Sequence, residues 1–160
     1  MLVGLQLVMK APVWALIARV DLVGGSTGYH RYKMVDNFIK KFGEWWLVGE
    51  QSTKHWGWMM DDTCQEYIQM GIRGGVLSLV LFIALFVFIF GITGRALKRY
   101  DYDFGLQHRF WALGVTAFTH LVAFFGIAYF DQSVFQLYFL FAVAASLENY
   151  YLNNQPASSP

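Results

Sequence analysis

The sequence has 160 residues, the size of one ordinary domain. Hydrophobic residues make up 56% and charged residues 14%, against about 45–50% and about 25% in average soluble proteins, so the composition excludes a disordered chain. Twelve Lys and Arg, eleven Asp and Glu, and the single cysteine Cys64 exclude a strongly basic nucleic-acid-binding surface, a disulfide framework within one chain and a cysteine-built metal site.

The first segment, residues 1–18, is hydrophobic but lacks the pattern of a signal peptide. Its charge, Lys10, lies in the middle and Pro12 interrupts the segment. We interpret it as the end of a preceding hydrophobic span or as an interfacial helix. The first interpretation implies that the chain is the C-terminal piece of a larger protein.

Residues 19–73 carry most of the polar side chains. A Gly-Gly-Ser-Thr turn at 24–27 precedes a stretch, 29–42, with helical periodicity. The apolar face of this predicted helix comprises Met34, Val35, Phe38, Ile39 and Phe42, and most of its charged residues lie on the other face. Such an amphipathic helix is typical of a membrane surface.

Gly49 is predicted to end this helical region, and a loop containing His55 follows. Tryptophans 45, 46, 56 and 58 have the composition of an interfacial belt, although their rings could also stack on sugars. Thr63 and Glu66 then fit a capping box, with Asp61 and Asp62 at the favoured N-terminal end of a short helix that ends near Gly71.

Three uncharged or nearly uncharged segments follow, at 74–94, 110–130 and 133–152. A segment of about 20 apolar residues is long enough to cross a bilayer as a helix. His120 lies at the middle of the second segment, where we expect it to hydrogen-bond to a neighbouring helix. The fold prediction is therefore all-α: an integral membrane helical bundle with about three transmembrane helices and an external amphipathic-helix segment.

The basic residues of the 95–109 connection indicate the orientation of these helices. Arg95, Lys98, Arg99 and Arg109 lie in this connection, and short basic loops are retained in the cytoplasm. Residues 19–73 are then external, and the tail, 153–160, is cytoplasmic and disordered.

Several motifs resemble the C-terminal part of the O-antigen polymerase and O-antigen ligase family of bacterial membrane proteins. They are the basic helix after the Gly-Ser-Thr turn, F-x-x-W-W-L-V-G at 42–49, W-G-W at 56–58 and M-G-I-R-G-G at 70–75 followed directly by a span. The resemblance implies a location in the bacterial cytoplasmic (inner) membrane. It also implies transfer of a glycan from a polyprenyl-diphosphate carrier to a hydroxyl of a sugar acceptor, with no metal or cofactor.

The resemblance assigns the diphosphate to an external arginine, and Arg31 matches that position best. Arg19 and Lys33 are weaker candidates for the same role, and a lipid headgroup could equally occupy these cations. Arginine suits the task because its planar fork of donors matches phosphate oxygens bidentately.

The resemblance implies a histidine about eleven residues before the glycine that matches Gly71. This family histidine has no counterpart here, because Met60 stands at that position and two aspartates follow. The candidate catalytic residues are therefore Asp61 and Asp62, which could also serve as helix caps, and His55, which could also be an ordinary loop residue.

The expected partners are the polyprenyl-diphosphate-linked glycan donor, the sugar acceptor, membrane lipid and the remaining transmembrane helices of a larger parent protein; nucleic acid is not expected. Two other interpretations stay open. The chain could be a non-enzymatic membrane component, such as a transporter fragment or an assembly partner, or it could be an inactive gene fragment.

Overall fold

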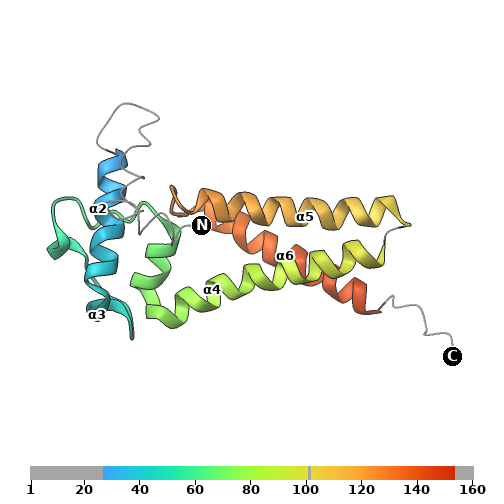
Figure 1. Ribbon diagram of the computed structural model, residues 1–160, viewed down its shortest axis with the longest axis horizontal. Coiled ribbons are helices and arrows are strands. Elements are labelled where there is room, and N and C mark those ends of the chain that lie inside the picture. Colours follow the sequence, from blue (N-terminus) through green and yellow to red (C-terminus); the bar gives the residue numbers. More distant parts are fainter. Residues whose placement is uncertain (1–26, 101, 154–160) are drawn as a thin grey trace, which may run out of the picture. The chain divides into compact units, whose positions relative to one another are not determined.

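The computed structural model describes residues 27–100 and 102–153, and every regular element in that part is helical (Figure 1). The elements are α2 (Thr27–Lys40), α3 (Phe42–Trp45), the 3-10 helix η2 (Lys54–Trp56), α4 (Glu66–Arg99), α5 (Phe104–Ala123) and α6 (Gln132–Asn153). The all-α prediction is confirmed. The predictions for residues 1–18, for Arg19 and for the tail from residue 154 onward lie outside the described residues.

The described chain forms two compact units. The first contains residues 27–79 with 126–128, and the second contains 80–125 with 129–153. Helix α4 begins in the first unit and ends in the second.

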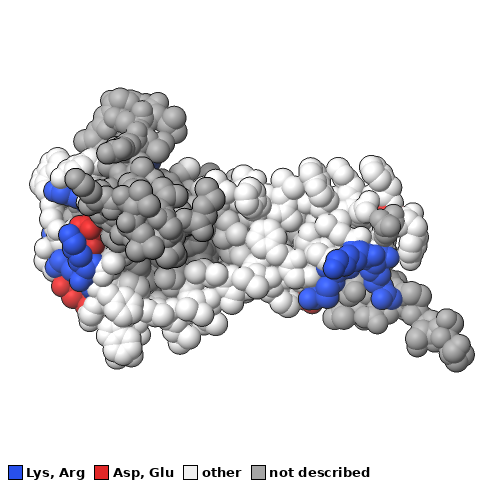
Figure 2. Space-filling view, in the orientation of Figure 1, with Lys and Arg blue, Asp and Glu red and all other residues white. Residues whose placement is uncertain are grey.

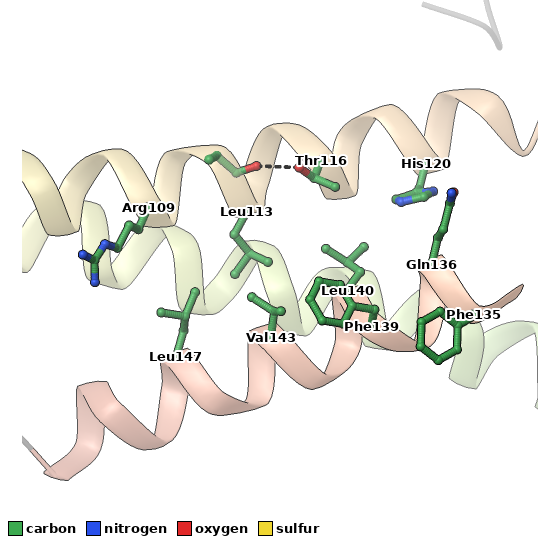
Figure 3. A pocket seen from close by; sticks show the side chains of 11 residues that line it. Arg109, Leu113, Thr116, His120, Phe135, Gln136, Phe139, Leu140, Val143 and Leu147 are labelled. Carbon is green, nitrogen blue, oxygen red and sulfur yellow. Dashed lines mark hydrogen bonds between the residues drawn. The ribbon is translucent and has the colours of Figure 1, made fainter. Parts of the chain in front are cut away.

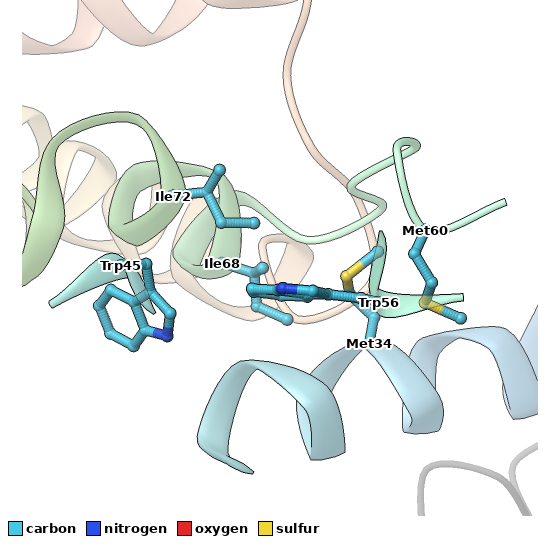
Figure 4. Packing of buried hydrophobic residues seen from close by; sticks show 6 residues of the cluster. All are labelled: Met34, Trp45, Trp56, Met60, Ile68 and Ile72. Carbon is cyan, nitrogen blue, oxygen red and sulfur yellow. The ribbon is translucent and has the colours of Figure 1, made fainter. Parts of the chain in front are cut away.

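The core of the first unit is built from α2, the following loops and the start of α4. It contains six buried side chains: Met34, Trp45, Trp56, Met60, Ile68 and Ile72 (Figure 4). Two of these residues, Trp45 and Trp56, belong to the tryptophans whose composition also fits an interfacial belt. They are buried because each satisfies its indole N–H within the unit, Trp45 by donating to the carbonyl of Phe38 at 2.8 Å and Trp56 by donating to Glu44 at 2.8 Å.

The predicted apolar face of the 29–42 helix is only partly correct. Met34 is buried, and Val35 and Phe38 pack against the core, but Ile39 and Phe42 are exposed. Ile39 lies in the last turn of α2. Phe42 is exposed because α2 ends at Lys40 and a short separate helix, α3, begins at Phe42, so the 3.6-residue periodicity does not continue through the break.

Gly49 ends this region, as predicted. Its φ of +86° lies in the left-handed region, which glycine adopts without the steric cost of a side chain, and its N–H donates to the carbonyl of Trp45 at 2.9 Å.

The predicted capping box at Thr63 and Glu66 is wrong. Helix α4 begins at Glu66 itself, so Thr63 is too far upstream to cap it. The Thr63 hydroxyl instead bonds to the side-chain amide of Gln69 at 3.1 Å.

Helix α4 is interrupted at Gly74 and Gly75, where the sequence predicts that the first span begins. Gly75 has φ +71° and ψ −169°, so the regular helix stops at Arg73, slightly beyond the predicted end near Gly71, and resumes after the two glycines. The segment 46–50 lies against the break, where Val76 N–H donates to the Trp46 carbonyl at 2.8 Å and Glu50 N–H donates to the Ile72 carbonyl at 2.7 Å.

Helix α4 is the one helix of the described chain that is long and apolar enough to cross a membrane. Only 28% of its most apolar stretch is buried inside the protein, and large apolar side chains such as Leu77, Leu81 and Val87 are exposed. The helix continues beyond the predicted end of the span at residue 94 and includes Arg95, Lys98 and Arg99.

The boundaries predicted for the second span and for the 95–109 connection need correction. Asp103 caps α5 by accepting from the Leu106 N–H at 3.1 Å, so the helix begins at Phe104 and only residues 100–103 connect it to α4. Helix α5 then ends at Ala123, and residues 124–130 form a turn followed by irregular chain. Helix α6 agrees with the predicted third segment to within one residue at each end.

The second unit is held together by aromatic and small-residue packing between its helices. The ring of Phe86 lies edge-on to Phe124 and Phe141, with centroids 5.9 Å and 5.6 Å away. A Cβ on Gly114 would come within 2.9 Å of the Thr93 methyl, so α4 and α5 approach closely there.

Charged side chains of the second unit are concentrated at one end. Figure 2 shows Lys and Arg gathered near the end where α4 stops and α5 begins, whereas the long visible face is mostly uncharged. Arg95 of α4 pairs with Glu148 of α6 at 3.7 Å.

Candidate functional site

The polar pocket of the first unit has a volume of about 450 Å³ and lies between α2 and the loop that leads to α4. Its α2 wall contains Tyr29, His30, Arg31, Lys33, Asp36 and Asn37, and its loop wall contains residues 56–60, Asp62 and Cys64. Two of the three predicted diphosphate ligands, Arg31 and Lys33, therefore line one pocket together with the predicted catalytic candidate Asp62.

Hydrogen bonds fix the loop wall against α2. Asn37 donates its side-chain N–H to the Trp56 carbonyl at 3.2 Å, and within the loop the buried Thr53 hydroxyl donates to the Met60 carbonyl. Met60 and Trp56 are themselves core residues, so the wall is anchored by both packing and polar contacts.

The pocket carries cations and aromatic surface side by side. Lys33 Nζ lies 5.1 Å from the centre of the Tyr29 ring, a cation–π distance. The exposed ring of Trp58 adds aromatic surface on the loop side. Such a combination can hold a phosphate on the cations and a sugar ring on an aromatic face.

One acidic residue of the pocket is already paired. Asp36 accepts from Lys40 Nζ at 2.7 Å, and this hydrogen bond raises the pKa of the Lys40 amine. Because the Asp36 carboxylate is paired with Lys40, it competes less with an anionic ligand for Arg31 and Lys33.

His30 is a pocket residue that sequence reasoning missed. Its Nε2 lies 3.3 Å from the backbone carbonyl of Asp62, and a carbonyl can only accept, so the proton of the neutral imidazole lies on Nε2 and Nδ1 keeps its lone pair. The available signal was its position directly before Arg31 on the same helix.

The other two catalytic candidates lie elsewhere. Asp61 is exposed and does not line the pocket. His55 lies outside it too, where its Nε2 is 2.7 Å from Glu44 Oε2. Hydrogen bonds from His55 and from Trp56 lower the pKa of the Glu44 carboxyl to about 2, so His55 contributes to a structural contact between α3 and η2.

Cys64 closes one side of the pocket. Its burial, together with the charge of Asp62, raises the pKa of the thiol, which favours the protonated, unreactive form. We therefore interpret Cys64 as a small packing residue. Across residues 27–100 and 102–153, no cluster of three or more His, Cys, Asp and Glu is arranged to hold a metal ion.

Comparisons with known proteins found no match for this chain, whether among family models, curated proteins or solved structures.

Proposed function

We propose that the chain is the C-terminal part of a membrane glycosyltransferase that takes a glycan from a polyprenyl-diphosphate carrier in surface polysaccharide assembly. The observation that carries this proposal is the pocket shared by Arg31, Lys33, His30 and aromatic rings, in the segment that directly precedes the long apolar helix α4. These groups suit the two halves of a glycosyl diphosphate.

In this proposal Arg31 and Lys33 bind the diphosphate. Arg31 binds the leaving diphosphate because its positive charge is permanent and its N–H donors match two phosphate oxygens at once. Negative charge on the diphosphate increases as the sugar departs, so a fixed cation stabilises the transition state more than the bound donor.

His30 acts as the general base in place of the family histidine. The acceptor hydroxyl gives its proton to Nδ1 of His30, the acceptor oxygen bonds to the anomeric carbon, and the bond from that carbon to the diphosphate oxygen breaks. The diphosphate departs with the electron pair of that bond. The Asp62 backbone carbonyl, by accepting from Nε2, holds the ring with Nδ1 available.

The membrane arrangement is part of the same proposal. Helices α4, α5 and α6 span the bacterial inner membrane, the basic connection between α4 and α5 is cytoplasmic, and the pocket is external. Support comes from the uncharged long face of the second unit and its basic end (Figure 2), since basic short connections stay in the cytoplasm.

A binding experiment tests the donor site. The full chain, in lipid nanodiscs, is titrated with farnesyl diphosphate, and binding is followed by tryptophan fluorescence because Trp58 lines the pocket. Farnesol and inorganic diphosphate serve as the two half-ligands. We expect saturable binding of farnesyl diphosphate, a large loss with Arg31→Gln, and little change with Lys54→Gln, which removes an exposed cation outside the pocket wall.

Equal binding by the wild type and Arg31→Gln would contradict the donor site. Binding that depends on Arg31 without glycan transfer in the complete parent protein would favour a non-enzymatic carrier-binding component.

A further inference from the structure

The second unit contains a groove between α5 and α6 that the proposed glycan transfer does not use. Its volume is about 670 Å³. Figure 3 shows Leu113 of α5 and Leu140, Val143 and Leu147 of α6 directed into the space between the two helices. The wall between its ends is therefore predominantly apolar.

Two polar side chains along this wall, those of Thr116 and His120, already bond within the protein. The Thr116 hydroxyl donates to the Ala112 carbonyl at 2.9 Å, and His120 Nδ1 lies 2.7 Å from the Tyr129 hydroxyl. A long apolar ligand would therefore not leave these groups without partners, which would otherwise be costly.

One end of the groove carries a cation, Arg109, as Figure 3 shows. Among the described residues of this unit no carboxylate forms an ion pair with it: Glu148 pairs with Arg95 at 3.7 Å and Asp103 caps α5. An anionic ligand group would supply the missing partner.

The length of the groove matches one leaflet of a bilayer. The eleven steps from Arg109 to His120 along α5 correspond to about 16 Å of helix, roughly half of the ~30 Å hydrocarbon core. We propose that the groove binds one acyl chain of an anionic phospholipid of the cytoplasmic leaflet, with the lipid phosphate on Arg109. This inference rests on the part of the proposed function that places α5 and α6 in the membrane.

The charge at Arg109 favours a phospholipid over a helix from a second copy of the chain. An apolar helix in the groove would cover Arg109 without pairing it, which is unfavourable in a membrane. A phospholipid satisfies both features at once, because its chain fills the apolar wall and its phosphate accepts the guanidinium donors.

Lipid retention tests this site without any glycan donor. The full chain is purified from mixed membranes containing equal phosphatidylglycerol and phosphatidylcholine with identical acyl chains, and bound lipid is counted by native mass spectrometry. We expect the wild type to retain phosphatidylglycerol preferentially. Arg109→Gln should lower that preference about fivefold, the effect of one basic side chain at an anionic headgroup, whereas Lys98→Gln, the matched control at the end of α4, should leave it unchanged.

A second variant tests the groove itself. Val143→Trp places a large side chain in the space and should reduce retention of both lipids, with helix content checked by circular dichroism. Added inorganic phosphate should not displace the lipid, because the acyl chain supplies the apolar contacts.

An unchanged preference in Arg109→Gln overturns the headgroup assignment. Unchanged lipid retention in a folded Val143→Trp protein overturns the lipid site. The same holds if the wild type is a dimer that Val143→Trp dissociates while lipid retention persists, because a second copy of the chain would then occupy the groove. Because no donor is present, a failure of glycan transfer leaves these results unaffected, and thiol labelling of the α4–α5 connection reports separately on whether the helices span the membrane.

Discussion

The Glu44 carboxylate accepts the indole N–H of Trp56 at 2.8 Å, and the same oxygen lies 2.7 Å from His55 Nε2. This relationship joins α3 to η2 across eight intervening loop residues (46–53). It also explains how a large aromatic ring can be buried in a small core without an unsatisfied donor.

The Glu44 contact predicts a loss of stability in acid. Its folded-state pKa of about 2 is below the ordinary 4.5, so its contribution is complete above 4.5 and is lost as the pH falls toward 2. Glu44→Gln should be less stable than the wild type at neutral pH, and this difference should shrink over that interval. Thermal unfolding in detergent at a series of pH values measures both effects.

Glu50→Gln is the matched control, because Glu50 accepts only a long bond, 3.4 Å, from the Ser52 N–H. An acid transition that is the same in Glu44→Gln as in the wild type would contradict this role of Glu44.

Gly75→Ala should destabilise the first unit. The residue has φ +71°, and a Cβ there would lie 2.6 Å from the Leu47 carbonyl oxygen, so both the backbone conformation and the contact oppose a side chain. Strained conformations of this kind cost about 1–3 kcal/mol. Gly43→Ala, where a Cβ meets nothing within 4 Å, should be nearly neutral or slightly stabilising, and equal unfolding midpoints for the two variants would contradict the argument.

Arg31→Lys should impair glycan transfer by the parent protein although it keeps the charge. Lysine loses the bidentate geometry, and removing a hydrogen bond to charge that develops in a transition state costs roughly 3 kcal/mol, about a hundredfold in rate. Lys40→Arg at matched expression is the control. Near-normal transfer by Arg31→Lys would mean that the arginine contacts only lipid headgroups.

His30→Gln should lower transfer while donor binding is preserved, because a base acts on the acceptor and not on the diphosphate. His55→Gln is the matched histidine control and should retain transfer, with at most a small loss of stability from the Glu44 contact. If His55→Gln abolishes transfer and His30→Gln does not, the base is His55.

His120 should have a packing role. The sequence predicts a hydrogen bond, and the structure confirms one at 2.7 Å, although the partner Tyr129 lies in the α5–α6 connection and not on a neighbouring helix. Tyr129→Phe should cost about 1 kcal/mol, the usual contribution of such a bond. His120→Gln in the parent protein should leave transfer largely intact, and a complete loss with normal protein levels would contradict the packing role.

The topology can be tested with thiol labelling in intact cells, in a Cys64→Ala background. Ser52→Cys should react with a membrane-impermeant reagent, and Tyr102→Cys, whose position is 84% exposed, should react only after lysis. The opposite pattern would reverse the orientation proposed from the basic connection.

Helices could be predicted from the sequence where one local signal dominates. Helix α6 matches its predicted boundaries because Asp131, with a positive φ of 50°, ends the preceding turn and a predominantly apolar segment follows. Helix α5 could not be predicted as well. Hydropathy locates the uncharged stretch 110–130, but the helix starts earlier, where Asp103 caps it. The helix also ends earlier than the uncharged stretch, and Phe124, directly after its last residue, packs against Phe86.

The pocket was predictable only in part for a similar reason. The position of Arg31 after a turn and on a basic helix is a local pattern, so its candidacy could be read from the chain. The approach of His30 to Asp62 joins residues 32 positions apart and depends on how the loop folds back over α2, which no periodicity encodes. The structural role of His55 likewise depends on Glu44, eleven positions away.

The break at Gly74 and Gly75 has a consequence for where water is needed. An interrupted helix exposes amide and carbonyl groups that normally bind solvent, and in a lipid environment each such group would be costly. Here the Trp46 carbonyl receives the Val76 N–H, and the Ile72 carbonyl receives the Glu50 N–H. Because the chain itself takes the place of solvent at these two groups, the bend in α4 can persist at a depth where hydration is sparse, and dehydrating detergents or osmolytes should not straighten it.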